Sequence, residues 1–117
     1  MRFVFDGCIS ETDSFKLYKA ADRAAINVRA INADGSPLDV SASTVTLEVY
    51  DRSDRKNAAV KSLALTTITA AAGAMTLTPA VATIDFGPGT YYVFLKHVLT
   101  AGAVVTISTN HIKLVIG

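Results

Sequence analysis

The strongest pattern in the sequence is the alternation of apolar and polar side chains over residues 44–50. Val45, Leu47 and Val49 alternate there with polar or aromatic residues. A period of two puts the apolar side chains on one face of a strand, as a sheet with one buried face requires. The opposite face, which includes Glu48, is expected to meet water. Similar runs recur along the chain without a sustained helical period, so the fold class is predicted to be all-β.

The predicted strands are short and separated by turn residues. Asp34-Gly35 and Pro37 close a turn after one of them, and a hairpin is expected to follow. The alanines before Gly73 favour one helical turn at most. Seven or eight short strands of this kind are typical of a sandwich or barrel. The expected strands cover residues 15–18, 25–31, 44–50, 60–65, 74–78, 91–98, 103–108 and 111–116.

Composition limits the possible partners. The chain has 117 residues, a length that suits one domain. It has 11 Lys and Arg against 10 Asp and Glu, which gives a formal net charge of +1. Such a balance gives no long-range attraction for phosphate or anionic lipid, so we expect no nucleic acid and no membrane as partner. Residues 62–84 carry no charge, but their threonines, Gly73 and Pro79 indicate a hairpin and loop rather than a membrane span. The apolar run before Asp6 is too short for a signal peptide.

Reactive side chains are few. Cys8 is the single cysteine, so neither an internal disulfide nor a cysteine metal cluster can form, and we interpret it as a small apolar residue or a free thiol. His97 falls on an apolar strand face, where a partly buried structural histidine is expected, and His111 is expected to face water. We therefore expect no enzyme, no catalytic residue and no cofactor.

Two other features could suggest ligands. A phosphate loop needs backbone N–H donors and a following lysine. In Gly87-Pro88-Gly89, the proline has no N–H and no lysine follows, so the segment is interpreted as a turn. The 8 aspartates are scattered rather than spaced as a calcium loop, so no metal site is predicted, and a structural or adventitious cation remains the alternative. The charged segment 51–57 is expected to be a solvated loop, with a partner-binding loop as the alternative.

Strand and turn segments follow one another in a recognisable order along the whole chain. They are residues 15–19, Asp22, 25–28, 34–40, 44–51, the turn and strand 73–78, and the Gly-Thr-Tyr segment 88–93. Taken together, they resemble the immunoglobulin-like domain of tailed-phage virion proteins, including the N-terminal domain of baseplate upper proteins. The resemblance covers residues 14–117 and implies an immunoglobulin-like β-sandwich of seven to eight antiparallel strands. Residues 1–13 would form an N-terminal arm or added strand.

The resemblance also implies a function. It points to a non-catalytic structural protein of the virion, assembled in the host cytoplasm. Family members carry this domain within longer proteins, whereas here it stands nearly alone, which favours a small capsid decoration (cement) protein. Its partners would be the major capsid protein, other virion proteins and further copies of itself. The alternatives are a tail, baseplate or fibre adaptor and, from another class, a carbohydrate- or host-receptor-binding module that uses exposed aromatics such as Tyr50.

The strand predicted at residues 91–98 is apolar on both faces. If Tyr91 and its neighbours line the core, Tyr92 and Phe94 point outward, and a monomer rarely leaves such a patch uncovered. The N-terminal segment is a candidate cover, supplied either by the same chain or by a neighbour. The interaction residues predicted from this pattern are Phe3, Val4, Phe5, Tyr92 and Phe94.

Overall fold

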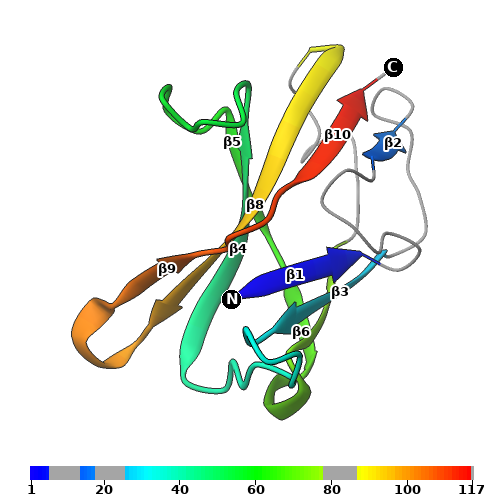
Figure 1. The fold of residues 1–117 in the computed structure, drawn as a ribbon. Helices are drawn as coiled ribbons and strands as arrows, with labels where there is room; N and C mark the ends of the chain where they lie inside the picture. The colour runs from blue at the N-terminus through cyan, green and yellow to red at the C-terminus, as the bar shows by residue number, and fades with distance from the viewer. Residues whose placement is uncertain (6–13, 18–25, 78–86, 117) are drawn as a thin grey trace.

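A computed structural model describes residues 1–5, 14–17, 26–77 and 87–116. These residues form two packed β-sheets with almost no helix, so the all-β class and the sandwich-like arrangement are confirmed (Figure 1). The strands are β1 (Arg2–Phe5), β2 (Ser14–Leu17), β3 (Ile26–Ile31), β4 (Ser43–Tyr50), β5 (Lys61–Ala64), β6 (Thr66–Thr69), β7 (Ala74–Leu77), β8 (Gly89–Leu99), β9 (Val105–Ile107) and β10 (Ile112–Ile116), with 3₁₀ turns η1 (Ala70–Ala72) and η2 (Ala101–Ala103).

One sheet has four strands in the order β1-β3-β7-β6, and each neighbouring pair is antiparallel. β6 and β7 form a hairpin around η1, and a bulge interrupts β6 between Thr67 and Thr69. Gly73 ends η1 in the left-handed conformation, at φ 62°. A left-handed residue is the usual end of a helical turn, and glycine adopts it without steric cost.

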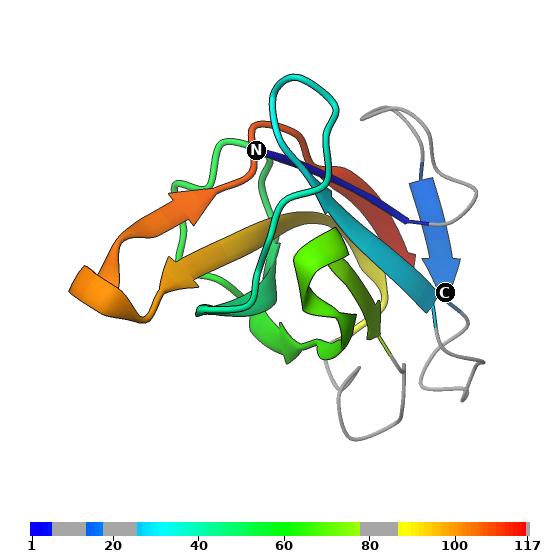
Figure 2. The same ribbon diagram turned by 90° about the horizontal axis from the view of Figure 1, so that it is seen from below.

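The other sheet has six strands and is organised around β8. Its order is β2-β10-β8-β4-β5, and β9 also pairs with β8. β4 follows one side of β8 along most of its length, while β10 and β9 share the other side. All of these pairs are antiparallel except β2–β10, which is parallel. Figure 2 shows the two sheets from below, with the β8–β9 hairpin extending beyond the four-stranded sheet.

The core lies between the sheets and is made by the alternating apolar side chains that the sequence pattern predicts. Leu47 and Val49 of β4 are fully buried, which confirms the expected inward face of this strand. The polar face differs from the prediction, because Glu48 is only 8% exposed. The other side chains of this core are Phe3, Val28, Ala30, Val40, Leu63, Met75, Leu77, Val93, Leu95, Ile112 and Leu114.

The predicted hairpin after β3 is wrong. The turn itself forms, because the Asn32 amide donates to the Ser36 carbonyl (2.8 Å) and Ile31 bridges to Pro37. The chain then crosses to the other sheet, where β4 pairs with β5 and β8 instead of β3. A second difference is β6, which the sequence analysis did not predict. The described part of the chain therefore contains ten strands rather than seven or eight.

The division into an arm at residues 1–13 and a sandwich at 14–117 stays a prediction. Residues 6–13, which include Cys8, lie outside the described part of the chain, and so does Asp22. In the part that is described, no helix is long and apolar enough to cross a membrane.

Candidate interaction surfaces

The predicted interaction residues Phe3, Val4 and Phe5 lie in β1, which pairs with β3 of the same chain. Phe3 is fully buried in the core, while Val4 is half-buried and lies opposite Arg29 in the register. Phe5 pairs with Val28, and its side chain is outside the described ones. Over residues 2–5, the N-terminal segment therefore covers its own sheet. The role of these residues in contacts between subunits stays a prediction, and in this conformation Phe3 has no surface to offer a neighbour.

Asn110 holds β1 in place from the connection between β9 and β10. Its Oδ1 accepts a hydrogen bond from the Phe3 amide (3.0 Å), and its Nδ2 donates to the Phe3 carbonyl (2.8 Å). The Thr109 amide also donates to the Met1 carbonyl (2.9 Å). Asn110 is only 9% exposed, so this paired contact is shielded from water. β1 is thus joined at both of its edges to its own chain.

Phe94 is covered by residues of its own sheet and of loop 51–57, whereas residues 2–5 of the N-terminal segment, the candidate cover, pair with β3 in the other sheet. Phe94 is only 5% exposed. The Tyr50 ring meets it edge-on at 5.7 Å between centroids, and the His111 ring lies 5.3 Å away. His111 is half-buried between Phe94 and the half-buried Tyr92, whose ring lies 5.4 Å from it. His111 therefore packs on aromatic rings instead of facing water as predicted.

The remaining cover of Phe94 comes from the charged loop 51–57. The guanidinium carbon of Arg55 lies 5.0 Å from the centre of the Phe94 ring. Arg52 fixes this loop through two hydrogen bonds to Asp54 (2.9 and 3.2 Å), and Asp54 also accepts from the Lys56 amide (3.1 Å). The hydrogen bond from the Lys56 amide lowers the pKa of Asp54 most, and the hydrogen bond from Arg52 lowers it further. The loop is exposed, as predicted, but through Arg55 it also contacts Phe94 of its own sheet.

Buried polar groups on the six-stranded sheet make no reactive cluster. Oε1 of Glu48 accepts hydrogen bonds from the hydroxyls of Thr46 and Ser62, both at 3.0 Å. His97 is 6% exposed on the core side of β8, and its Nε2 has no hydrogen-bond partner. Burial lowers the pKa of His97. His97 is more deeply buried than the prediction stated, and its structural role stays a prediction. Across the described residues, no three His, Cys, Asp or Glu side chains come together as a metal site.

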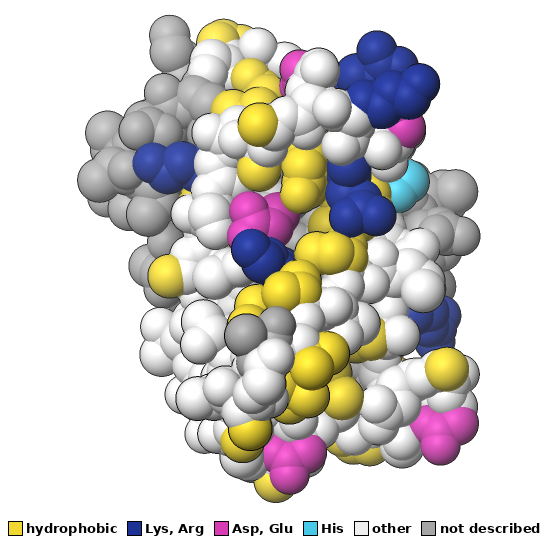
Figure 3. Space-filling model, turned by 90° about the vertical axis from the view of Figure 1, so that its left-hand side faces the viewer, with side chains coloured by type: hydrophobic (Ala, Val, Ile, Leu, Met, Phe, Trp, Pro, Cys, Tyr) yellow, Lys and Arg dark blue, Asp and Glu magenta, His cyan; other side chains and the backbone are white. Residues whose placement is uncertain are grey.

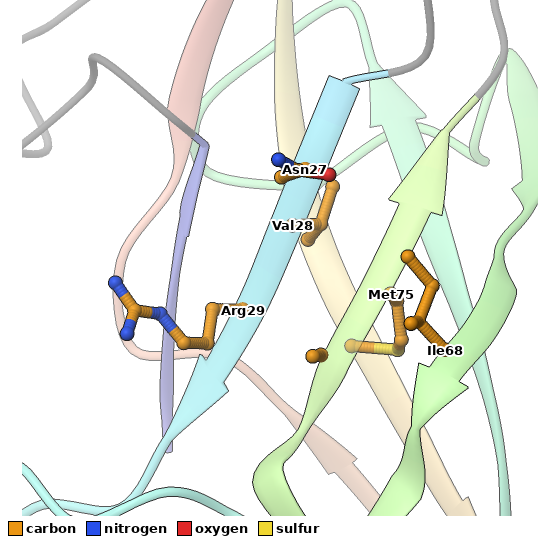
Figure 4. Close-up of a pocket in the computed structure, with 6 residues that line it drawn as sticks. Asn27, Val28, Arg29, Ile68 and Met75 are labelled. Atoms are coloured by element: carbon orange, nitrogen blue, oxygen red, sulfur yellow. The ribbon is translucent and has the colours of Figure 1, made fainter.

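A depression of about 390 Å³ lies on the four-stranded sheet. Asn27 and Arg29 of β3, Met75 of β7 and Ile68 of β6 line it, and Figure 4 shows Arg29 extending toward β1 while Ile68 lies beside Met75. The bulge in β6 leaves Ile68 62% exposed. An amide, a guanidinium and an apolar side chain can contact another polypeptide, but they supply no acid, base or nucleophile in catalytic geometry.

Three of the five large apolar side chains that are exposed among the described residues lie on the β8–β9 hairpin. Leu99, Val104 and Val105 are 38%, 53% and 54% exposed. The hairpin projects from the body of the molecule, and a stripe of hydrophobic side chains runs down this side (Figures 1 and 3). The sequence analysis missed this surface. A usable signal was present, because no Lys, Arg, Asp or Glu occurs between Lys96 and Lys113.

Neither the family models nor the curated proteins with which the chain was compared give a match.

Proposed function

We propose that this protein is a capsid decoration protein of a tailed phage, a non-catalytic component of the virion with an immunoglobulin-like domain. The observation that carries the proposal is the apolar β8–β9 hairpin, where Leu99, Val104 and Val105 are exposed on a projecting element. Exposed apolar patches of this kind mark protein–protein contacts. The sandwich-like pair of sheets agrees with the resemblance to virion domains.

The proposed mechanism is stabilisation by binding. A protein that binds the assembled head and not its separated subunits shifts the equilibrium toward the intact head. Many identical copies multiply this effect even when each contact is weak. The buried core lies between the two sheets, and the hairpin places apolar side chains away from that core, where they can reach a neighbour.

Heads that lack this protein provide the direct test. Heads from a deletion strain should rupture at lower temperature than wild-type heads, and added purified protein should bind them and restore the rupture temperature. The V104E variant should bind weakly, because it places a charge in the apolar contact, whereas I68E on the other sheet should bind as wild type. No binding to heads, or equal binding by both variants, would contradict the proposal.

Copy number in purified particles separates the head from the tail. A copy number comparable to that of the major capsid protein supports decoration, and a number comparable to that of tail or baseplate proteins supports an adaptor.

The aromatic cluster around Phe94 is poorly suited to sugar binding. A stacking platform needs an accessible ring face, and Arg55 covers that of Phe94.

A further inference from the structure

β9 has an open hydrogen-bonding edge. The carbonyl of Val104 and the amide of Ser108 both bond to β8, at 2.9 Å. In an antiparallel ladder, the backbone groups of successive residues point alternately to the two sides. The amides and carbonyls of Val105 and Ile107 therefore point away from β8. No described strand pairs with β9 on that side.

The other edge strands of the described residues each carry a feature that opposes strand addition. β1 has Arg2 and is bonded on its outer edge to Asn110, β2 has Lys16, β5 has Lys61, and a bulge interrupts β6 between Thr67 and Thr69. Charged residues and bulges of this kind are the usual means by which proteins protect a sheet edge from pairing with another chain. β9 has the sequence Val-Thr-Ile and contains neither a charge nor a bulge. It is thus the one described edge that is left suitable for pairing.

We propose that β9 pairs with β9 of a second copy, antiparallel and across a two-fold axis that passes between the two Thr106 residues. In this register Val105 of each copy lies opposite Ile107 of the other, and both have outward-pointing backbone groups. Each such pair exchanges two N–H···O bonds, so the strands share four. Thr106 lies opposite its own copy as a non-hydrogen-bonded pair. The two six-stranded sheets become one continuous sheet, and the inference does not depend on the virion assignment.

The charge pattern suits a second copy of this chain as the partner. A two-fold axis places the residues next to it close to their own copies, so a charge at the centre of the paired strands would repel its own copy. β9 and the turn before it are uncharged, so self-pairing brings no like charges together. The nearest charge is Lys96, opposite Ile107 on β8. Lys96 residues of the two copies would be separated by three strand spacings, roughly 14 Å, which exceeds the screening length at physiological salt.

The side chains also suit this pairing. Val105 and Ile107 of the two copies would pack against each other on the face that carries Val98, which is half-buried in the monomer. Apolar β-branched neighbours and a central Thr–Thr pair are both favourable cross-strand combinations. Val105, now 54% exposed, would lose much of its contact with water.

Charge substitutions at Thr106 test the proposal, because this exposed residue lies nearest to its own copy in the dimer. In sedimentation velocity over a concentration series, wild-type protein should dimerise. T106K and T106E should each raise the dimer dissociation constant by about tenfold or more, and an equimolar mixture of the two should recover dimers. T67K, a charge on the bulged edge strand β6, should dimerise as wild type. A monomeric wild type, or T106K and T67K with equal dissociation constants, would overturn the proposal.

Cross-linking tests the register without altering charge. In a C8S background, T106C should form a disulfide-linked dimer on mild oxidation, because non-hydrogen-bonded partners place their Cα atoms about 4.5 Å apart, within disulfide range. The matched T67C variant should cross-link no faster than expected for random collision. Equal cross-linking rates for the two variants would show that β9 does not pair in this way, and thermal melting of each variant would establish that it is folded.

Discussion

Arg55 lies over the ring of Phe94, with its guanidinium carbon 5.0 Å from the ring centre, while its backbone takes the left-handed conformation at φ 55°. It is the one non-glycine residue with positive φ among those the structure describes. A left-handed backbone costs an ordinary residue about 1–2 kcal/mol. The left-handed backbone thus accompanies a cation–π contact on Phe94, which Tyr50 and His111 also cover.

Two substitutions at Arg55 should separate its side chain from its backbone. R55A removes the cation and keeps the strain, so the free energy of unfolding should fall by about 1 kcal/mol. R55G removes the cation and relieves the strain, so it should be about 0.5–1 kcal/mol more stable than R55A. Urea unfolding followed by circular dichroism measures both. K56A, a neighbouring exposed site, should change stability by less than about 0.5 kcal/mol. Equal stability of R55A and R55G would contradict the strain argument.

Gly73 should be much less tolerant of alanine than Gly35, although both have positive φ. A Cβ at Gly73 would lie 2.6 Å from the Leu38 carbonyl oxygen and 2.8 Å from that of Ala30, so the backbone would have to move. A Cβ at Gly35 would meet no atom within 4 Å. We expect G35A to cost about 1 kcal/mol from φ alone, and G73A at least about 2 kcal/mol more. Thermal or urea unfolding of the two variants measures this difference, and similar costs would contradict the close packing around η1.

Local sequence patterns correctly predicted those structural elements that are determined by residues close together in the sequence. Alternation in β4 identified Leu47 and Val49 as core residues, and the alanines before Gly73 predicted a single helical turn. The turn at Asp34-Gly35 was also predicted, since short side chains and positive φ are local properties. Each of these features depends on residues that are neighbours in sequence.

Features that depend on distant residues could not be predicted in this way. Alternation showed that both faces of β8 are apolar, but the cover of Phe94 comes from residues 55 and 111, far away in the chain. The turn after β3 did not reveal that β4 joins the other sheet, because the same turn can lead either to a hairpin with β3 or to a crossing between the sheets. The exposed edge of β9 depends likewise on which strands pair with β8. Its lack of charge was visible in the sequence, but its position at an edge was not.

Loss of the Asn110 amide should detach β1. N110D keeps an acceptor for the Phe3 amide but places a carboxylate oxygen against the Phe3 carbonyl, where Nδ2 now donates. Leaving a buried polar group without a partner costs about 1–3 kcal/mol, more when the group is charged. We expect N110D to lose at least about 2 kcal/mol of stability and the Phe3 amide to exchange hydrogen faster. N57A removes an exposed amide bonded to Asp51 and should cost less than about 1 kcal/mol. Unchanged protection of the Phe3 amide in N110D would contradict this role.

Stability should fall on mild acidification because of His97. Burial lowers its pKa below the ordinary value of 6.5, so the unfolded chain binds the proton more readily than the folded one. The contribution of the neutral ring is complete above pH 6.5 and is lost as the pH falls below that value. The lowered pKa values of Asp34 and Asp39, caused by hydrogen bonds from Ser36 and Ser41, act only near and below their ordinary value of 3.8.

Urea unfolding at several pH values between about pH 5 and 7 measures the effect of His97. H97L should flatten the dependence, because leucine fills the buried site without a group that can take a proton. H111Q should unfold at lower urea concentration, since it removes the ring that contacts Phe94. If H97L retains the full slope, the buried ring of His97 is not its source.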